Sequence, residues 1–393
     1  MRTTKFGIIG LGGRGCVFQD NNHLPEEGYE IVAGADIDEG ALAAFSKRFP
    51  QAAAFKDYRD LLAVPELDAV FIITPDFLHE EIACAAMKAE KHIYLEKPLA
   101  ITVDGCENIL RTAMNTGRKL YVGHNMRFFP VIQKMKEIID SGKIGEVQLG
   151  WCRHFINYGG DAYFHDWHSE RRCINGLLLQ KGAHDIDVLH WLMDSYTTKV
   201  TAMGMLSVYN KCLRREPGTP SKAVWDEKNY PPEEVQIPFS PVIDVEDSNM
   251  VLMQLKNGKQ CAYLQCHYTP DSDRNYTFIG TRGRIENHGV GDNAQILIWT
   301  KRAAVTLVPD EMICLRGIPG THSGADPAIM KNFREYIRYN RKPFTNPVEA
   351  MRAVLTGIKA HEAARTDLCA REIPEIAPDL TTYFCREDNG ACQ

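Results

Sequence analysis

Short apolar runs alternate with amphipathic stretches along the first 125 residues of the chain. The runs with the length of fully buried parallel strands are residues 6–9, 30–35, 67–73, 92–95 and 119–123. The stretches with a helical spacing of apolar side chains are residues 39–49, 78–89 and 102–116, together with the segment that ends near residue 24. Strands that alternate with helices at this interval predict βαβ units and a parallel sheet.

The pattern changes after about residue 125. Residues 129–141 still have helical spacing, and the apolar stretches that follow resemble strands of an open sheet, at residues 147–152, 200–208, 249–255, 260–267 and 275–279. We expect a sheet region without helices here, interrupted by a long loop at residues 213–241. Because the chain is too long for one ordinary core, we predict an α/β protein with a hinge near His124. Residues 1–124 would form a doubly wound parallel sheet, and residues 125–393 an α+β domain with a large, open, mostly antiparallel sheet.

A glycine fingerprint follows the first predicted strand. Its residues are Gly10, Leu11, Gly12, Gly13, Arg14 and Gly15. An acid at the end of the second strand, Asp36, lies 36 − 15 = 21 residues beyond the last glycine, close to the spacing of about 20 in dinucleotide-binding folds. In such folds the glycines permit the tight turn, the approach of the pyrophosphate and the packing of helix on strand. A glycine turn without a ligand is the alternative.

Asp36 and Arg14 bear on the choice of cofactor. A carboxylate at the end of the second strand accepts hydrogen bonds from the ribose hydroxyls of NAD and repels the 2′-phosphate of NADP. Arg14 could contact such a phosphate, contact the pyrophosphate, or remain solvated. We therefore predict NAD, with NADP as the less favoured cofactor.

Lys97 stands directly after the predicted strand at residues 92–95, between Glu96 and Pro98. The carboxyl ends of parallel strands border the crevice where nucleotides bind, so this lysine can meet both a cofactor and a substrate. Oxidation of a secondary alcohol needs a base that takes the hydroxyl proton while hydride leaves. Desolvation near other cations lowers the pKa of a lysine toward the range of such a base. A solvated surface lysine is the alternative.

Several motifs together resemble the Gfo/Idh/MocA oxidoreductase family. In chain order they are GLGGRG at residues 10–15, TPDFLH at 74–79, EKP at 96–98, NMRF at 125–128, GAHDID at 182–187 and FIGTRGRIE at 278–286. The resemblance implies an N-terminal Rossmann domain with a nicotinamide cofactor and a C-terminal open-sheet domain. It also implies hydride transfer to or from a sugar or polyol carbon, and a Lys97–Pro98 peptide of a kind that is often cis. Besides the glycine turn and Asp36, the residues expected at the cofactor are Thr74, Pro75, His79, Glu96, Lys97 and Asn125.

The catalytic histidine of the family corresponds to His184, which opens a helical pattern; a capping or core histidine is the alternative. Many family members carry aspartate four residues earlier, where this chain has Gln180. A related branch that acts on glucosides and anhydrosugars has lysine at the place of Lys181. Two lysines near one hydroxyl would lower each other's pKa by repulsion. We rank Lys97 first, His184 second and Lys181 third as catalytic residues.

Side chains suited to a carbohydrate flank these segments, because aromatic rings stack on its C–H faces and charged groups bind its hydroxyls. The residues predicted to bind the substrate are Arg127, Tyr158, His165, Trp167, Lys181 and His184. A late loop with His322 and Asp326 resembles a family segment that can line the pocket. A zinc site within residues 165–173 has incomplete ligand spacing, so we predict no metal.

Composition narrows the possible partners. The net charge of −6, from 45 basic and 51 acidic residues, comes without a long basic run and argues against nucleic acid or an anionic membrane surface. No apolar stretch reaches the roughly 18 residues of a membrane helix, and no secretory signal pattern opens the sequence. The 12 scattered cysteines favour reduced, mostly buried thiols. We predict a cytoplasmic protein, and the resemblance implies a homodimer or homotetramer.

These features predict an NAD-dependent dehydrogenase of a sugar, glycoside or cyclic polyol. One alternative is a glycosidase that uses bound NAD for transient oxidation at C3, as another branch of the family does. The other is a non-catalytic sensor of sugar or cofactor, against which the intact Lys97 and His184 argue.

Overall fold

The computed structural model describes residues 2–221, 224–302 and 308–385. The chain forms two compact units. The first comprises Met1–Asn125, Gly324–Met351 and Glu375–Gln393, and the second comprises Met126–Ser323 and Arg352–Pro374. The chain therefore returns twice to the first unit. The predicted division into residues 1–124 and 125–393 does not include these two returns.

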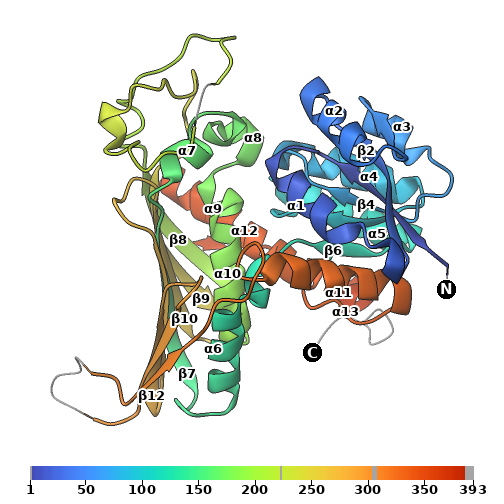
Figure 1. The fold of residues 1–393 in the computed structure, drawn as a ribbon. Helices are drawn as coiled ribbons and strands as arrows, with labels where there is room; N and C mark the ends of the chain where they lie inside the picture. The colour runs from blue at the N-terminus through green and yellow to red at the C-terminus, as the bar shows by residue number, and fades with distance from the viewer. Residues whose placement is uncertain (1, 222–223, 303–307, 386–393) are drawn as a thin grey trace. The chain divides into compact units, whose positions relative to one another are not determined.

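The first unit is built on a parallel six-stranded sheet in the order β3-β2-β1-β4-β5-β6 (Figure 1). This is the strand order of a Rossmann fold. Its strands are β1 (Thr4–Ile9), β2 (Tyr29–Ala35), β3 (Ala53–Phe55), β4 (Ala69–Ile72), β5 (His92–Leu95) and β6 (Leu120–Val122). Its helices are α1 (Gly13–Asn22), α2 (Glu39–Arg48), α3 (Tyr58–Leu62), α4 (His79–Lys88), α5 (Val103–Thr116), α11 (Ala325–Tyr339) and α13 (Pro378–Cys385). The predicted parallel sheet is confirmed, although the sequence analysis did not anticipate β3 or α3.

Local sequence explains where these helices begin. Asp38 caps α2 by accepting a hydrogen bond from the Ala41 backbone at 2.7 Å, and Thr102 caps α5 through the Gly105 backbone at 3.0 Å. Such caps satisfy backbone N–H groups that the first helical turn leaves unpaired. The starts of α2 and α5 are therefore each encoded by a single side chain.

Helix α11 belongs to the first unit because its apolar face packs on the sheet. Phe333 is fully buried and meets Phe71, Tyr94 and Tyr121 edge-on, with ring centroids 5.2 to 5.7 Å apart. These rings come from β4, β5 and β6, and each edge-to-face pair stabilises the packing beyond the area it buries. The return of the chain after residue 323 thus completes the core of this unit.

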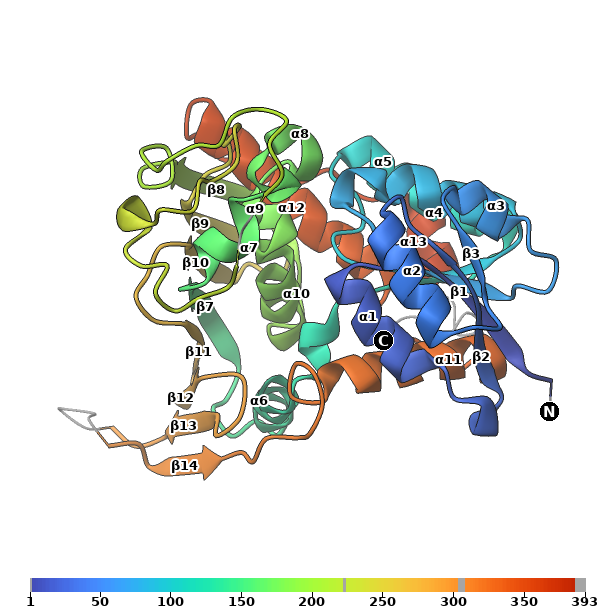
Figure 2. The same ribbon diagram turned by 45° about the horizontal axis from the view of Figure 1, so that its top comes forward.

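The second unit is built on a nine-stranded sheet in the order β14-β13-β12-β11-β7-β10-β9-β8-β15 (Figure 2). Its strands are β7 (Val147–Phe155), β8 (Thr197–Met205), β9 (Ser248–Leu255), β10 (Gln260–Cys266), β11 (Asp273–Gly280), β12 (Gly283–His288), β13 (Gln295–Trp299), β14 (Glu311–Cys314) and β15 (Arg371–Glu372). Strands β7 and β10 pair in parallel, and the other neighbours are antiparallel. The predicted large, mostly antiparallel sheet is confirmed.

The expectation of a sheet region without helices is wrong. Helix α10 (Gly182–Leu192) lies within this region, and together with α6 (Pro130–Asp140), the helix predicted at residues 129–141, it covers one face of the sheet (Figure 1). Shorter helices are α7 (Gly159–Tyr163), α8 (Arg171–Ile174) and α9 (Leu177–Gln180), and α12 (Pro347–Arg365) continues from the first unit into the second. The inward strand residues are apolar and need a covering layer, which explains why helices occur here.

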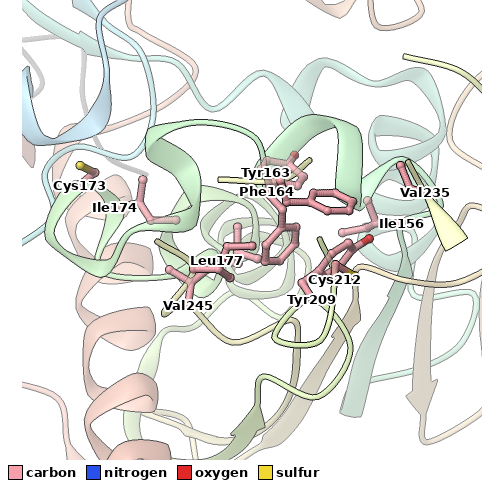
Figure 3. Close-up of a cluster of buried hydrophobic side chains, with 12 residues drawn as sticks. Ile156, Tyr163, Phe164, Cys173, Ile174, Leu177, Tyr209, Cys212, Val235 and Val245 are labelled. Atoms are coloured by element: carbon pink, nitrogen blue, oxygen red, sulfur yellow. The ribbon is translucent and has the colours of Figure 1, made fainter. Parts of the chain in front are cut away.

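A separate apolar cluster lies in the second unit and holds the predicted long loop (Figure 3). It joins residues of α7 and α8 to loop residues, and its buried members are Ile156, Tyr163, Phe164, Cys173, Ile174, Leu177, Tyr209, Cys212, Val235, Phe239, Ile243 and Val245. Phe164 and Tyr209 stack at 3.9 Å between ring centroids. Residues near 158 and 163 therefore sit on a packed base rather than on a mobile loop.

Within residues 2–385, as far as the structure describes them, ten cysteines carry free thiols, including the buried Cys84, Cys106 and Cys152, whereas Cys385 is disulfide-bonded. The expectation of reduced thiols does not extend to Cys385. No helix in the described ranges combines the length and apolarity needed to cross a membrane.

Candidate active site

The glycine turn between β1 and α1 combines two different requirements. Gly10 has φ +94°, and a Cβ there would lie 2.4 Å from the Ile73 carbonyl oxygen. A Cβ on Gly15 would lie 2.2 Å from the Gly10 carbonyl oxygen. Gly12 and Gly13, by contrast, have no atom within 4 Å of the Cβ position. The turn is thus packed on one side and open on the other.

The open side of the turn fits a dinucleotide. Helix α1 begins at Gly13, so Gly12 offers no capping side chain, and the first backbone N–H groups and the positive end of the helix dipole point into the open space. A helix N-terminus of this kind binds phosphate. The residues that would hold NAD here are those of the turn and Asp36.

Asp36 follows β2 and is fixed beside the turn. Its Oδ2 accepts a hydrogen bond from the Leu11 backbone at 2.6 Å, and its Oδ1 accepts one from the Asp38 backbone at 2.9 Å. The next residue, Ile37, is 89% exposed. A carboxylate held in this position can accept hydrogen bonds from ribose hydroxyls, as the sequence predicts.

Arg14 is engaged by two carboxylates of its own unit. Its Nη1 and Nη2 donate to Asp326 at 2.7 and 2.9 Å, and its Nε donates to Glu96 Oε1 at 2.9 Å. Asp326 is fully buried and also accepts a hydrogen bond from Asn125 Nδ2 at 2.9 Å. Burial opposes the charge of Arg14, but Glu96 and Asp326 outweigh it and raise the pKa of the guanidinium. This network joins three residues that the sequence places near the cofactor, Arg14, Glu96 and Asn125, to Asp326. Asp326 lies 312 residues from Arg14 along the chain.

Lys97 is placed by the residues on either side of it. The Lys97–Pro98 peptide is cis, as the resemblance implied, and Glu96 Oε2 accepts a hydrogen bond from the Lys97 backbone at 3.0 Å. The buried His79 ring bridges the loops after β4 and β5, with Nδ1 2.7 Å from the Pro98 carbonyl oxygen and Nε2 3.0 Å from that of Thr74. Lys97 is partly exposed at the carboxyl end of β5.

In the second unit the structure brings Lys181 and Tyr158 together. Lys181 Nζ donates to the Tyr158 hydroxyl at 3.0 Å, directly before α10. Burial opposes the charge of Lys181, but Tyr163 and Tyr158 outweigh it and raise its pKa. This corrects the expectation of a lysine whose pKa is lowered. His184 is buried in the first turn of the same helix.

A buried network beside this pair was missed from the sequence. The Asp185 carboxylate binds Arg274 Nε and His154 Nδ1, both at 3.1 Å, and accepts a hydrogen bond from the Tyr276 hydroxyl. Burial opposes the charge of Asp185, but Arg274 and His154 outweigh it and hold its pKa well below the ordinary value. The sequence feature that could have indicated this network is the presence of ionisable residues in apolar strands. His154 and Arg274 occupy inward positions of β7 and β11, where a charged residue needs a partner.

Other predicted substrate residues have partners within the second unit. Arg127 forms a buried bidentate pair with Asp187, at 2.7 and 2.6 Å. His165 is buried, stacks on Phe239 with centroids 4.4 Å apart, and has its Nδ1 3.2 Å from the Pro238 carbonyl oxygen. Two further predicted residues of this unit have aromatic neighbours. The Trp167 ring stacks on His168, and the centroid of the His322 ring lies 6.0 Å from that of Phe129. In the parts of the chain that the structure describes, no group of three or more His, Cys, Asp or Glu side chains could hold a metal ion.

The fold and the glycine turn define a nucleotide-binding protein with a Rossmann unit and a separate open-sheet unit. Comparison with family models gives the assignment. Residues 4–124 match the oxidoreductase family model with an NAD-binding Rossmann fold, and residues 136–368 match the model of its C-terminal alpha/beta domain. The chain belongs to the Gfo/Idh/MocA oxidoreductase family, and its first unit is the NAD-binding Rossmann domain of that family.

Individual relatives are similar over different extents. The inositol 2-dehydrogenase/D-chiro-inositol 3-dehydrogenase of Halalkalibacterium halodurans is 34% identical over 194 residues, 49% of this chain and 53% of that protein. The match therefore spans about half the length of this curated relative. Levoglucosan dehydrogenase in complex with NADH and L-sorbose has a TM-score of 0.77 at 18% identity, covering 96% of this chain and 100% of that one. Scyllo-inositol dehydrogenase from Lactobacillus casei with bound NAD(H) and scyllo-inositol has a TM-score of 0.69 at 19% identity, covering 95% and 99%. At such identities the likeness concerns the fold.

Proposed function

We propose that this protein is an NAD-dependent dehydrogenase that removes a hydride from a secondary hydroxyl-bearing carbon of a sugar, glycoside or cyclic polyol. The observation that carries the proposal is the placement of Lys97, which follows β5 of an NAD-binding sheet and is fixed by Glu96 and Pro98. The names of similar proteins, which include inositol and levoglucosan dehydrogenases, support this substrate class.

We assign the proton chemistry first to Lys97, then to His184 and then to Lys181. Bound NAD supplies the hydride acceptor. A lysine that binds the substrate hydroxyl can take its proton as the carbonyl forms. Tyr158 and Lys181 have polar atoms suited to sugar hydroxyls, whereas the Nε and Nη2 atoms of Arg127 already bind Asp187, so Arg127 would act through that carboxylate. His165 and Trp167 would contribute ring surface.

We infer that the cofactor is NAD rather than NADP from the position of the Asp36 carboxylate and from the carboxylates that bind Arg14. Asp36 is held at the turn by two backbone hydrogen bonds, where a 2′-phosphate would meet its charge. Arg14, the cation that could neutralise such a phosphate, is bound by Asp326 and Glu96. Both features oppose NADP.

We further propose that the open face of the second unit's sheet pairs with a second copy of the chain. The large apolar side chains exposed on this face are Leu149, Met203, Met205, Met250 and Leu252. They come from three strands, and their pairing places Met203 opposite Met250. An apolar patch of this kind on a sheet is typical of a protein interface.

The experiment that tests the activity is an NADH-absorbance screen of the purified protein against inositols, free hexoses, glucosides and anhydrosugars. NAD and NADP are run in parallel, with wild type beside Lys97→Met and the control Lys88→Met, an exposed lysine at the end of α4. We expect NADH formation with one substrate class, a loss of about 10²-fold or more in kcat for Lys97→Met, and no loss for the control.

Three other results would contradict the proposal. Equal activity of wild type and Lys97→Met would exclude Lys97 from the chemistry. Cleavage of an aryl glycoside without net NADH would indicate a redox-assisted glycosidase. Inactivity in both assays, with NAD binding retained in a fluorescence titration, would indicate a sensor.

A further inference from the structure

Lys181 is a partly buried cation whose acceptor is a phenol. Its Nζ donates to the Tyr158 hydroxyl at 3.0 Å and lies 5.3 and 5.9 Å from the ring centroids of Tyr158 and Tyr163. It forms no ion pair with an aspartate or glutamate among the residues of the described ranges. A cation removed from water is usually paired with an anion, because an uncompensated charge there is costly. The oxygen in position to become that anion is the Tyr158 phenol.

The other titratable groups around the pair leave no unengaged anion for Lys181, because the Asp185 carboxylate has other partners and burial raises the pKa of the Tyr163 phenol. They are Arg274, Asp185, Tyr163, His154 and His267. Arg274 adds positive charge, and Asp185 is bound by Arg274 and His154. Burial lowers the pKa of His154 to about 3 and holds that of His267 well below its ordinary value, so both rings are neutral near pH 7.

These charges favour ionisation of Tyr158. Burial opposes a phenolate, but Lys181 and Arg274 outweigh it, and the pKa of Tyr158 is lowered from its ordinary value of about 10. The raised pKa of Lys181 is the counterpart of this effect. The ammonium and the phenolate therefore stabilise each other.

We propose that Tyr158 is a catalytic residue that exchanges a proton with the substrate hydroxyl, and that Lys181 is the positioning cation that keeps it ionised. The inference rests on the proposed dehydrogenase function and refines it. In the oxidation, the substrate O–H bond breaks and its proton bonds to the phenolate oxygen of Tyr158. The electron pair of that O–H bond forms the second C–O bond, and hydride leaves the same carbon for the nicotinamide. In this refinement Tyr158, rather than Lys97, is the group that takes the proton.

The Tyr158 side chain is held from more than one direction, as proton transfer requires. Its ring stacks on Trp225 with centroids 5.3 Å apart and planes 18° apart, and its hydroxyl is fixed by Lys181. The Trp225 segment is anchored in turn, because Asp161 of α7 accepts hydrogen bonds from Asn229 Nδ2 at 2.8 Å and the Asp226 backbone at 3.3 Å. Tyr158 also packs against the apolar cluster of Figure 3.

The first test reads ionisation directly and needs no substrate. Tyrosinate ultraviolet absorbance is titrated against pH for wild type, Tyr158→Phe, Lys181→Met and Lys181→Arg, with Tyr163→Phe as the matched control and circular dichroism as the check of folding. We expect one tyrosine of wild type to ionise below the ordinary pKa of about 10. This step disappears in Tyr158→Phe, moves to higher pH in Lys181→Met, and persists in Lys181→Arg and Tyr163→Phe. A step that is absent from wild type or unchanged in folded Tyr158→Phe overturns the inference.

The second test uses the substrate found in the NADH screen. We expect kcat of wild type to rise with pH through the same ionisation, and Tyr158→Phe to lower kcat by about 10²-fold or more and flatten the profile while NAD binding is unchanged. Lys97→Met should lower kcat but keep the pH-dependent rise. An unchanged kcat and profile in Tyr158→Phe overturns the catalytic role. A wild-type tyrosinate step together with no oxidation of any polyol counts against the dehydrogenase proposal alone.

Discussion

Single glycines of the turn after β1 have separate roles that a sequence motif does not distinguish. Gly10 and Gly15 are needed because backbone atoms of the protein itself occupy the Cβ positions. Gly12 and Gly13 face open space, so the folded chain has no steric need for glycine there. The requirement for glycine at Gly12 then comes from the close approach of a pyrophosphate.

This difference predicts opposite behaviour of two similar variants. Gly12→Ala should keep the free energy of unfolding within about 1 kcal/mol of wild type, since alanine tolerates its φ of −64°, while NAD affinity falls at least about tenfold. Gly15→Ala should lose about 1–3 kcal/mol or more of stability, because its Cβ would overlap the Gly10 carbonyl. Chemical denaturation and an NAD fluorescence titration measure both quantities. A Gly12→Ala protein with wild-type affinity would place the cofactor elsewhere.

At the scale of elements, Glu246 ties two helices of the second unit to the segment before β9. Its carboxylate accepts hydrogen bonds from Arg171 Nη2 of α8 at 2.8 Å and from Arg365 Nε and Nη2 of α12 at 2.8 and 2.7 Å. Burial opposes its charge, but the hydrogen bond and charge of Arg365 outweigh it and lower the pKa of Glu246 to about 2. Two cations would be left without their partner if this carboxylate were removed.

The lowered pKa sets the sign of a pH dependence. A carboxyl group with a lower pKa in the folded state than its unfolded value of about 4.3 contributes stability above that value and loses it as pH falls toward 2. We expect Glu246→Gln to reduce the free energy of unfolding by about 3 kcal/mol at pH 7, with a difference that shrinks below about pH 4. Urea denaturation at several pH values measures it, with Glu216→Gln on the exposed loop as the control. A difference that is constant with pH would contradict this account.

At the scale of the whole molecule, the two faces of the nine-stranded sheet differ. Helices α6 and α10 cover one face (Figure 1). On the other face Met250 and Leu252 are each 63% exposed, next to each other along the outward side of β9. Exposed apolar side chains on a sheet carry a free-energy cost in water that pairing with a second copy removes.

We expect wild type to be a dimer or tetramer in solution and the double variant Met250→Glu, Leu252→Glu to have a smaller mass by light scattering. Charges on an apolar interface remain hydrated only when the copies separate. Val308→Glu, a similar change at an exposed position outside the strands, should leave the mass unchanged. Circular dichroism checks that the double variant is folded. A wild-type monomer, or a double variant of unchanged mass, would exclude this face as the interface.

The sequence by itself determined the elements whose signal is local. The apolar runs of β1, β2, β4 and β5 and the helical spacing between them predict the parallel sheet, because burial on both faces selects such runs. The glycine turn and the acid after β2 could likewise be found, since their spacing follows from the turn and the strand that separate them. Local alternation was also enough to predict the strands β7, β9 and β10.

Only the tertiary structure decided which distant residues meet. The spacing of apolar residues along the chain does not predict that Arg14 binds Asp326 or that Lys181 binds Tyr158. It also does not predict that Phe333 of α11 completes the core of the first unit. The same holds for the parallel pairing of β7 with β10 inside a mostly antiparallel sheet. A pattern of apolar and polar residues fixes which face of an element is buried, but its partner is selected by packing and charge over the whole chain. Those partners in turn set whether a lysine stays charged and whether a tyrosine can ionise.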